Sequence, residues 1–192
     1  MENLDRYLFH WINGGLSHPW LDQFLPAITD LHKEPIVAYA VLPLILLIWV
    51  FKKRTQALQT LLGLILVIAC TDNINHRILK PLFQRERPPV VEHQIQLRTD
   101  RFGGFSFPSN HATNNFAGAT FLSLTYPLAS PIFFLIAFLV GLSRVYVGVH
   151  YPFDILAGGL WGAAFAYLFF KVWHPLMTHV HWPLLFSFWK RK

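Results

Sequence analysis

Long apolar runs, separated by shorter polar stretches, are the main pattern along this chain. A helix needs about 20 predominantly apolar residues to cross the hydrocarbon of a bilayer. Five runs approach this length, and they cover residues 35–51, 57–75, 108–127, 131–147 and 153–173. The pattern therefore predicts an all-α fold, a polytopic membrane helix bundle with about five transmembrane helices.

The first 34 residues follow a weaker pattern. Their apolar side chains recur at helical spacing in two groups, which Gly14-Gly15 and Pro19 separate. Charged side chains lie on the other faces, which is typical of short helices at a membrane interface. A sixth, poorly hydrophobic span is the alternative. We expect three regions: N-terminal interfacial helices at 1–34, a membrane-embedded core at 35–175 and a cytoplasmic C-terminal tail at 176–192.

Composition also favours a membrane protein. Hydrophobic residues make up 54% of the chain and charged residues 14%, with a mean hydropathy of +0.38. So few charges cannot coat a soluble domain. The net charge of +6 comes from clusters beside apolar segments, which suits anionic lipid headgroups and the bilayer better than nucleic acid. No obligatory protein partner is evident, and the single cysteine, Cys70, allows no intrachain disulfide.

The basic clusters predict an orientation in the membrane. Lys52-Lys53-Arg54 and Lys190-Arg191-Lys192 are expected on the cytoplasmic side by the positive-inside rule. Counting alternate crossings then puts the N-terminus, the loop at 76–107 and the turn at 144–153 together on the opposite side. The loop is itself basic, against the rule, and we attribute its cations to an anionic substrate.

Three polar strings lie near the expected ends of the apolar helices. They are Lys80 with Arg87-Pro88, then Pro108-Ser109-Asn110-His111, and then Ser143-Arg144 with His150 and Asp154. A phosphoryl group carries negative charge on three oxygens, and its transfer needs cations, a nucleophile and a proton donor. Together the strings supply all three kinds of group.

Taken singly, most of these residues have an ordinary alternative role. Lys80 and Arg87 provide a point charge and a forked donor for phosphate, or they are interfacial anchors. Ser109 caps a helix or donates to phosphate, and His111 in an ordinary helix start would be structural. Arg144 is harder to dismiss, because a charge at the edge of the hydrocarbon is costly without a partner.

The pair formed by His150 and Asp154 suggests an oriented imidazole. Pro152 suits the first turn of a helix, so His150 precedes that helix and Asp154 lies in its first turn. A carboxylate there can hold the imidazole Nδ1–H and leave Nε2 free to attack, as in catalytic triads. A purely structural histidine–carboxylate pair is the alternative.

In combination, the three strings resemble the signature of the type 2 phosphatidic acid phosphatase family, which shares its core with vanadium haloperoxidases. The chain reads Lys-x6-Arg-Pro at 80–88, Pro-Ser-x-His at 108–111 and Ser-Arg-x5-His-x3-Asp at 143–154. Order and internal spacing match the family pattern. One position departs from it, because Asn110 stands where the family usually has glycine.

The resemblance implies a role for each matching residue. His150 would attack phosphorus and form a phosphohistidine, Asp154 would orient it, and His111 would protonate the leaving oxygen and then activate water. The phosphate-binding residues would be Lys80, Arg87, Ser109, Asn110 and Arg144. Because protein cations neutralise the phosphate, we expect no metal and no cofactor.

The implied substrate is a lipid phosphate or diphosphate, with undecaprenyl diphosphate, phosphatidylglycerol phosphate, phosphatidic acid and lipid A phosphates as candidates. A lipid phosphotransferase and a non-catalytic lipid-phosphate-binding protein are the alternative functions. The expected location is the bacterial cytoplasmic membrane, with the site on its periplasmic or extracytoplasmic face. We read Arg98, Asp100 and Arg101 as residues that solvate a loop, with contact to the headgroup as the alternative.

Overall fold

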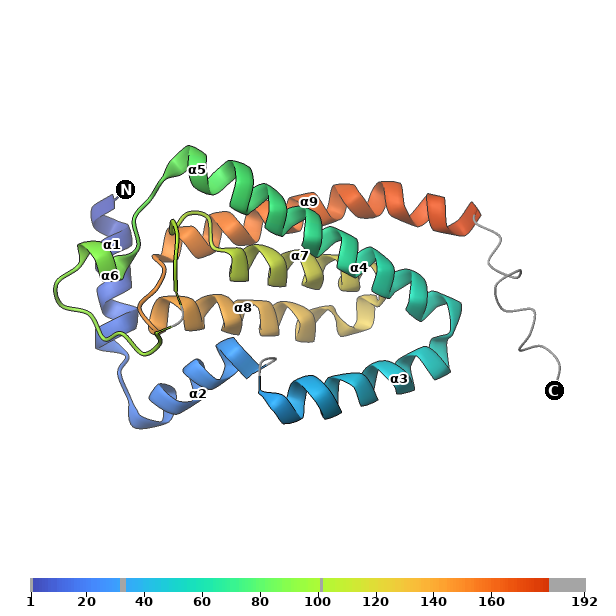
Figure 1. Ribbon diagram of the computed structural model, residues 1–192, viewed down its shortest axis with the longest axis horizontal. Helices are drawn as coiled ribbons and strands as arrows, with labels where there is room; N and C mark the ends of the chain where they lie inside the picture. Colours follow the sequence, from blue (N-terminus) through green and yellow to red (C-terminus); the bar gives the residue numbers. More distant parts are fainter. Residues whose placement is uncertain (1, 32–33, 101, 180–192) are drawn as a thin grey trace.

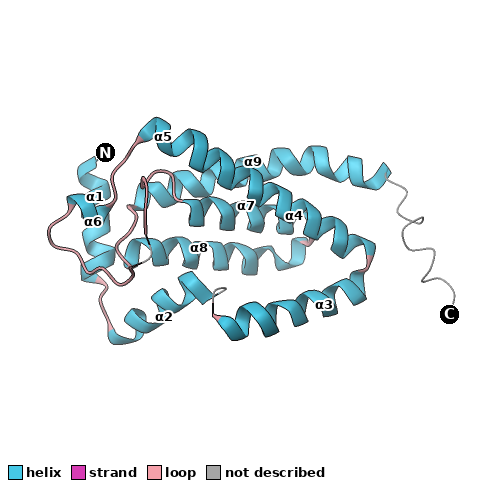
Figure 2. Cartoon of the chain, viewed as in Figure 1, coloured by secondary structure: helices cyan, strands magenta, loops and turns pink. Residues whose placement is uncertain are grey.

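The computed structural model describes residues 2–31, 34–100 and 102–179, and in this part of the chain helices joined by loops form the structure, without strands (Figures 1 and 2). Its α-helices are α1 (Glu2–His10), α2 (Pro19–Asp30), α3 (Leu42–Lys53), α4 (Thr55–Ile74), α5 (Lys80–Phe83), α6 (Pro88–Val91), α7 (Asn110–Thr125), α8 (Ser130–Tyr146) and α9 (Pro152–His179). Shorter helical turns are η1 (Trp11–Gly15), η3 (Val37–Val41), η4 (Asn75–Leu79) and η5 (Pro127–Ala129). The predicted all-α class is confirmed.

Helix α7 lies at the centre of the bundle. It packs most extensively on α9 and α8 and also contacts α4, and the four helices run lengthwise beside one another (Figure 1). Its buried positions are mostly small or weakly polar, and Phe121 joins Val67 of α4 and Ala166 of α9 in the apolar core. The central helix therefore contacts protein on several sides, which explains its modest hydrophobicity.

Two glycines allow α9 to approach α7 closely. A Cβ atom at Gly162 would come within 2.2 Å of the Thr113 carbonyl oxygen, and one at Gly158 within 2.8 Å of the Ser109 carbonyl oxygen. Small residues four apart are the usual means by which membrane helices reach this separation. The close contact joins the start of α7 to the start of α9, where the Ser109 amide donates to the Asp154 carbonyl at 3.1 Å.

Within the described residues, three segments are long and apolar enough to cross a membrane. They are Thr55–Val91, Pro127–Tyr146 and Pro152–Met177, which contain three of the five predicted spans except for residue 147. The other two predicted spans form α7, of 16 residues, and α3, of 12 residues preceded by η3. The number of spans, five or six, stays a prediction.

The second predicted span continues beyond its expected end at residue 75. The π-helical turn η4 connects α4 to α5, and the helical path ends only at Gln84, which has a left-handed backbone. Lys80 was expected just past the span but lies inside this continuation. The end was predicted from the polar residues at 71–73. Of these, Thr71 and Asp72 contact Asn114 of α7, both at 3.0 Å, and Asn75, buried just beyond them, donates to Thr113 Oγ1 at 2.8 Å.

The N-terminal segment packs on one end of the bundle, as two helices joined by η1. Asn13 is buried and its Nδ2 donates to the carbonyl oxygens of Gln96 and Tyr146, both at 2.8 Å. At the other terminus, α9 extends to His179, past the predicted end at 173. Most of the predicted C-terminal tail, from residue 180, lies outside the described residues.

Candidate active site

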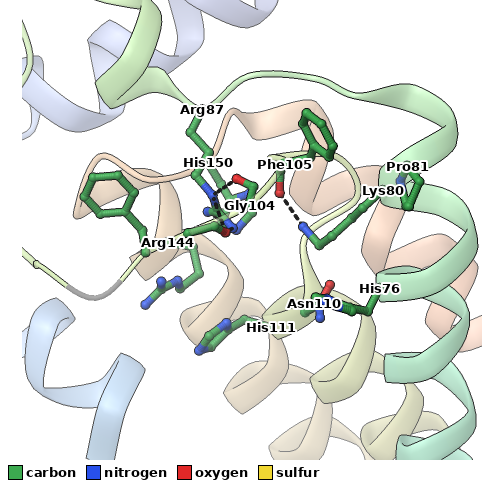
Figure 3. A pocket seen from close by; sticks show the side chains of 12 residues that line it. His76, Lys80, Pro81, Arg87, Gly104, Phe105, Asn110, His111, Arg144 and His150 are labelled. Carbon is green, nitrogen blue, oxygen red and sulfur yellow. Dashed lines mark hydrogen bonds between the residues drawn. The ribbon is translucent and has the colours of Figure 1, made fainter.

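A cavity of about 520 Å³ opens at the end of the bundle where α7 and α9 begin (Figure 3). Its walls come from η4, α5, the loop between α5 and α6, the loop before α7, the start of α7, the end of α8 and the turn between α8 and α9. The lining residues are His76, Lys80, Pro81, Arg87, Phe102, Gly103, Gly104, Phe105, Asn110, His111, Arg144 and His150.

This cavity brings together six of the eight residues that the sequence suggested. Lys80, Arg87, Asn110, His111, Arg144 and His150 all line it. The remaining two, Ser109 and Asp154, are fully buried behind the wall. These residues, up to 70 positions apart, thus converge on one hollow, to which they contribute three cations and two histidines.

His150 faces the cavity with one defined ring tautomer. Arg87 Nη1 lies 3.0 Å from His150 Nε2, and a guanidinium can only donate, so Nε2 is the unprotonated acceptor. The ring proton is therefore on Nδ1, which lies 3.4 Å from Asp154 Oδ2 and 3.3 Å from Ser106 Oγ. This is the orientation in which Nε2 can act as a nucleophile.

Burial keeps this imidazole neutral. Removal from water lowers the pKa of His150 from 6.5 to about 3; the nearby Arg87 and Lys80 also lower it, and Asp154 opposes the shift. Since a protonated imidazole has no lone pair for attack, the lowered pKa keeps the ring in its nucleophilic form at neutral pH.

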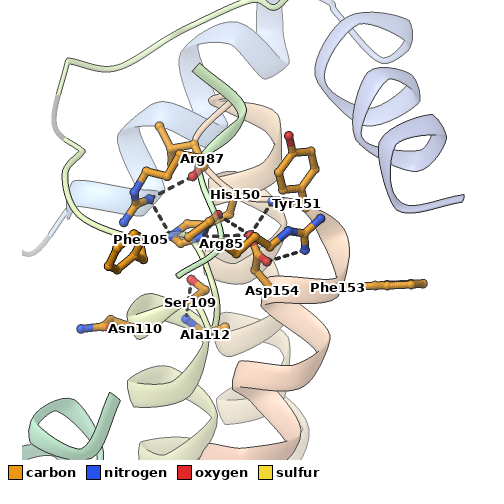
Figure 4. Close-up of polar contacts among 12 residues, drawn as sticks. Arg85, Arg87, Phe105, Ser109, Asn110, Ala112, His150, Tyr151, Phe153 and Asp154 are labelled. Carbon is orange, nitrogen blue, oxygen red and sulfur yellow. Dashed lines mark hydrogen bonds and ion pairs between the residues drawn. The ribbon is translucent and has the colours of Figure 1, made fainter. Parts of the chain in front are cut away.

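Asp154 is held in place by donors from several elements (Figure 4). Ser106 Oγ donates to Oδ2 at 2.5 Å, and the Tyr151 amide donates to the same oxygen at 2.8 Å. Arg85 Nη1 donates to Oδ1 at 2.7 Å. A fully buried carboxylate with this many partners is rigid and remains ionised, which suits a group that must orient and stabilise an imidazolium.

Backbone carbonyls fix the two cations of the first string. Lys80 Nζ donates to the Phe105 carbonyl at 2.5 Å. Arg87 uses Nε and Nη2 on the Gly103 carbonyl, at 3.1 and 2.9 Å, and Nη1 on the Val149 carbonyl at 2.9 Å. Both side chains are largely buried. Their charge is therefore directed into the cavity before any anion is bound.

The start of α7 supplies the second string. Ser109 is the N-cap, and its Oγ accepts from the Ala112 amide at 3.5 Å. Asn110 donates through Nδ2 to Asp72 Oδ1 at 2.9 Å, so the residue that replaces the usual glycine is tied to α4. The helix N-terminus points at the cavity and adds partial positive charge there.

Arg144 and His111 lie on the side of the cavity opposite Lys80 (Figure 3). Arg144 is buried near the end of α8, and its Nη1 donates to Thr29 Oγ1 of α2 at 3.0 Å. Three cations therefore surround a space that Nε2 of His150 borders, with His111 at its edge. An anionic tetrahedral group would be enclosed by charge on several sides.

Comparison with known proteins identifies the family. The family model described as the PAP2 superfamily matches residues 56–178, which contain every residue of the three strings. The chain belongs to the PAP2 superfamily. It is similar to the lipid A 4'-phosphatase of Bacteroides thetaiotaomicron, with 30% identity over 94% of this chain and 81% of that one. It is also similar to phosphatidylglycerophosphatase B of Bacillus subtilis, with 31% identity over 74% and 70%.

Solved structures agree with this assignment. The crystal structure of Aquifex aeolicus LpxE matches with a TM-score of 0.67 and 30% identity, covering 88% of this chain and 95% of that one. This PAP2 protein is accordingly an integral membrane protein and a membrane lipid phosphatase, that is, a hydrolase of phosphoric esters.

The structure also adds residues that the motifs do not contain. Arg85 and Ser106 both bind Asp154, and His76 lines the cavity. Asp5, from the distant α1, pairs with Arg85 at 2.6 Å. Arg85 and Ser106 lie in the polar stretch around the first two motifs, but its composition does not distinguish them from their neighbours. No sequence signal indicated Asp5.

Our interpretation of Arg98 was wrong. Its side chain is 11% exposed, and Nε donates to Asp22 Oδ1 at 2.7 Å. Nη1 donates to the Tyr146 carbonyl at 2.9 Å, and the guanidinium lies 4.2 Å from the centre of the Tyr146 ring. Arg98 therefore holds the loop on α8 and α2 instead of solvating it. Arg101 lies outside the described residues.

Proposed function

We propose that this PAP2 phosphatase hydrolyses a lipid phosphate or diphosphate in two steps through a phosphohistidine on His150. The observation that carries the proposal is the unprotonated Nε2 of His150, which faces the cavity among Lys80, Arg87 and Arg144. A binding protein needs the cations but not an oriented nucleophile. His111, on the cavity wall, completes the set as the proton donor.

In the first step, Nε2 of His150 forms a bond to phosphorus while the bond from phosphorus to the leaving oxygen breaks. The protonated His111 gives its proton to that oxygen. In the second step, a water oxygen attacks phosphorus, the N–P bond breaks, and His111 takes a proton from the water. Asp154 stabilises the positive charge on the imidazole between the two steps.

The cations neutralise the charge on the three phosphate oxygens. Without substrate, Arg87 Nη1 donates to Nε2 of His150 at 3.0 Å. When the substrate enters, the same N–H group donates to a phosphate oxygen instead. That exchange leaves the lone pair of Nε2 directed at phosphorus. Lys80 and Arg144 contact the other oxygens, and the amides at the start of α7, including that of Asn110, add partial positive charge.

The similar proteins indicate the class of substrate. Relatives named for lipid A, phosphatidylglycerophosphate and undecaprenyl diphosphate support a phosphorylated membrane lipid. To test the function, the purified protein in detergent is incubated with these lipid phosphates, with and without acceptor lipids, and free phosphate is measured. We expect phosphate release independent of acceptor. Phosphate passed mainly to an acceptor would indicate a phosphotransferase, and binding without turnover a non-catalytic protein.

A metal-independent mechanism is also part of the proposal. Among residues 2–31, 34–100 and 102–179, no three His, Cys, Asp or Glu side chains form a group that could hold a metal ion, and Lys80, Arg87 and Arg144 supply the positive charge. We expect activity to survive EDTA and to be inhibited by vanadate, which imitates pentacoordinate phosphorus. Phosphate release is the measurement. Loss of activity in EDTA that Mg²⁺ restores would contradict this mechanism.

We further propose that the cavity opens on the extracytoplasmic side of the bacterial cytoplasmic membrane. In support, the basic turn between α3 and α4 and the end of α9 lie at the opposite end of the bundle from the cavity (Figure 1). Positive residues are retained on the cytoplasmic side. A lipid substrate would then present its phosphate at the outer surface.

Cysteine labelling in intact cells tests this orientation. In a Cys70→Ser background, His93→Cys should react with a membrane-impermeant thiol reagent, because residue 93 is exposed at the cavity end. Arg54→Cys, at an exposed position of the other end, should react only after the cells are permeabilised. The reverse pattern would place the site in the cytoplasm.

A further inference from the structure

Two charged residues outside the three motifs are linked to the catalytic pair. Asp5 of α1 has 1% of its surface exposed, although it comes from the weakly patterned N-terminal segment. Arg85 lies in the short loop between α5 and α6, two residues before Arg87. A carboxylate so deeply buried is costly unless it is paired, so its partners indicate why it is there.

Arg85 joins Asp5 to Asp154 through the two ends of its guanidinium. Nη2 donates to Asp5 Oδ2 at 2.6 Å, and Nη1 donates to Asp154 Oδ1 at 2.7 Å. The guanidinium also lies 4.1 Å from the centre of the Tyr151 ring. Two carboxylates and an aromatic ring therefore fix the Arg85 guanidinium. A planar guanidinium can bridge two carboxylates in this way, whereas the ammonium of a lysine is not suited to it.

Asp5 also contacts the helix that carries Asp154. Its Oδ1 accepts from the Phe153 amide at 2.8 Å, which is one of the free amides in the first turn of α9. Asp5 of α1 thus binds both the first turn of α9, which carries Asp154, and the guanidinium of Arg85, which contacts Asp154. Its position affects the catalytic carboxylate by both routes.

Charge sharing gives Asp5 an electrostatic effect as well. With Asp154 as its only anion, Arg85 would cancel the charge of that carboxylate. Because Asp5 shares the cation, the group of two carboxylates and one guanidinium keeps a net negative charge beside His150. This charge is useful only when the imidazole becomes positive during attack, so it stabilises the transition state more than the bound substrate.

We propose that Asp5 and Arg85 are positioning residues for His150 and Asp154, so that helix α1 completes the active site. This inference rests on the phosphohistidine mechanism proposed above. The two residues contact neither substrate nor the reacting atoms. They act through Asp154, which they hold in place and keep negatively charged.

The test compares Asp5→Asn with a variant that loosens the same segment elsewhere. Asp5→Asn keeps the size of the side chain but removes its charge. We expect kcat to fall about 10–100-fold, by analogy with the hydrogen-bond partners of metal ligands, and less than the roughly 10⁴-fold for a carboxylate that contacts the histidine. The inhibition constant of inorganic phosphate, a tetrahedral anion that resembles the ground state, should change less than about threefold, because Lys80, Arg87 and Arg144 are untouched.

Asn13→Ala is the matched control. Asn13 also anchors the N-terminal segment, through the Gln96 and Tyr146 carbonyls, but it does not contact Asp154 or Arg85. It should lower the unfolding temperature in detergent while kcat stays near that of the wild type. If Asp5→Asn merely reproduces this pattern, or weakens the binding of inorganic phosphate as much as it lowers kcat, Asp5 is only a docking residue and the inference is wrong.

A second variant covers the case in which Asp5→Asn does not fold. Arg85→Lys keeps one positive charge but cannot bridge both carboxylates, so it should lower kcat and leave the binding of inorganic phosphate intact. An unchanged kcat in a folded variant of either residue would overturn the inference. His150→Ala measured in parallel separates the two proposals, because activity remaining in that variant would contradict the phosphohistidine mechanism itself.

Discussion

Replacing His150 with alanine should lower phosphate release from every substrate by a factor on the order of 10⁶, the scale for removing the nucleophile of a coupled catalytic group. Nε2 of His150, which lies 3.0 Å from Arg87 Nη1 on the cavity wall, is the atom that the mechanism joins to phosphorus. The loss should be the same for lipid and aryl phosphates, because both need a bond between Nε2 and phosphorus. Initial rates of phosphate release measure it.

His76→Ala is the control for this experiment. His76 lines the same cavity from η4, but we assign it no role in the reaction, so its removal should leave most of the activity. Vanadate should still bind to the His150→Ala protein, though more weakly, since the cations remain. If His150→Ala turned over as fast as His76→Ala, a different group would be the nucleophile.

The motif residues could be predicted because their chemistry is local in the sequence. Pro152 starts α9, so His150 precedes the helix and Asp154 lies in its first turn, as the spacing indicated. Likewise Ser109 caps α7 and directs the next residues at the cavity. Short spacings and breaker residues fix such geometry without knowledge of the rest of the fold.

Contacts between distant segments could not be predicted in the same way. Asp5 and Arg85 are 80 residues apart, and Arg98 meets Asp22 across 76 residues. A single sequence shows that these residues are charged but not which charge each one meets. We therefore assigned Arg98 to solvent, whereas packing of the N-terminal helices against α8 removes it from water.

The ends of helices were also predicted less accurately than the motif residues. A polar segment after residue 70 indicated that the second span stops near 75, but α4, η4 and α5 form one path to Phe83. Hydropathy cannot distinguish polar residues that leave the membrane from polar residues that face a protein cavity, because both interrupt an apolar run. Here Lys80 faces the cavity, and Asn75 is buried against Thr113 of α7.

Replacing His111 with alanine should separate its role from that of His150 by the chemistry of the leaving group. Loss of a general acid typically costs about 10²–10⁴-fold, and the full cost should fall on lipid monoesters, whose alkoxide is a poor leaving group. An aryl phosphate made from an acidic phenol needs no such help, because its phenolate can leave without a proton. The His111→Ala protein should therefore release a burst of phenol from it, measured by absorbance in a stopped-flow instrument.

The burst should end with the enzyme phosphorylated. His111 also takes the proton from the attacking water, so its loss slows hydrolysis of the N–P bond, and an acid-labile phosphohistidine should accumulate in proportion to the burst. His150→Ala should give neither burst nor phosphoenzyme, since it cannot form the N–P bond. If neither His111→Ala nor His150→Ala shows a burst, His111 is needed to form the phosphoenzyme whatever the leaving group. A burst confined to His150→Ala would instead identify His111 as the nucleophile, because the N–P bond would then form without His150.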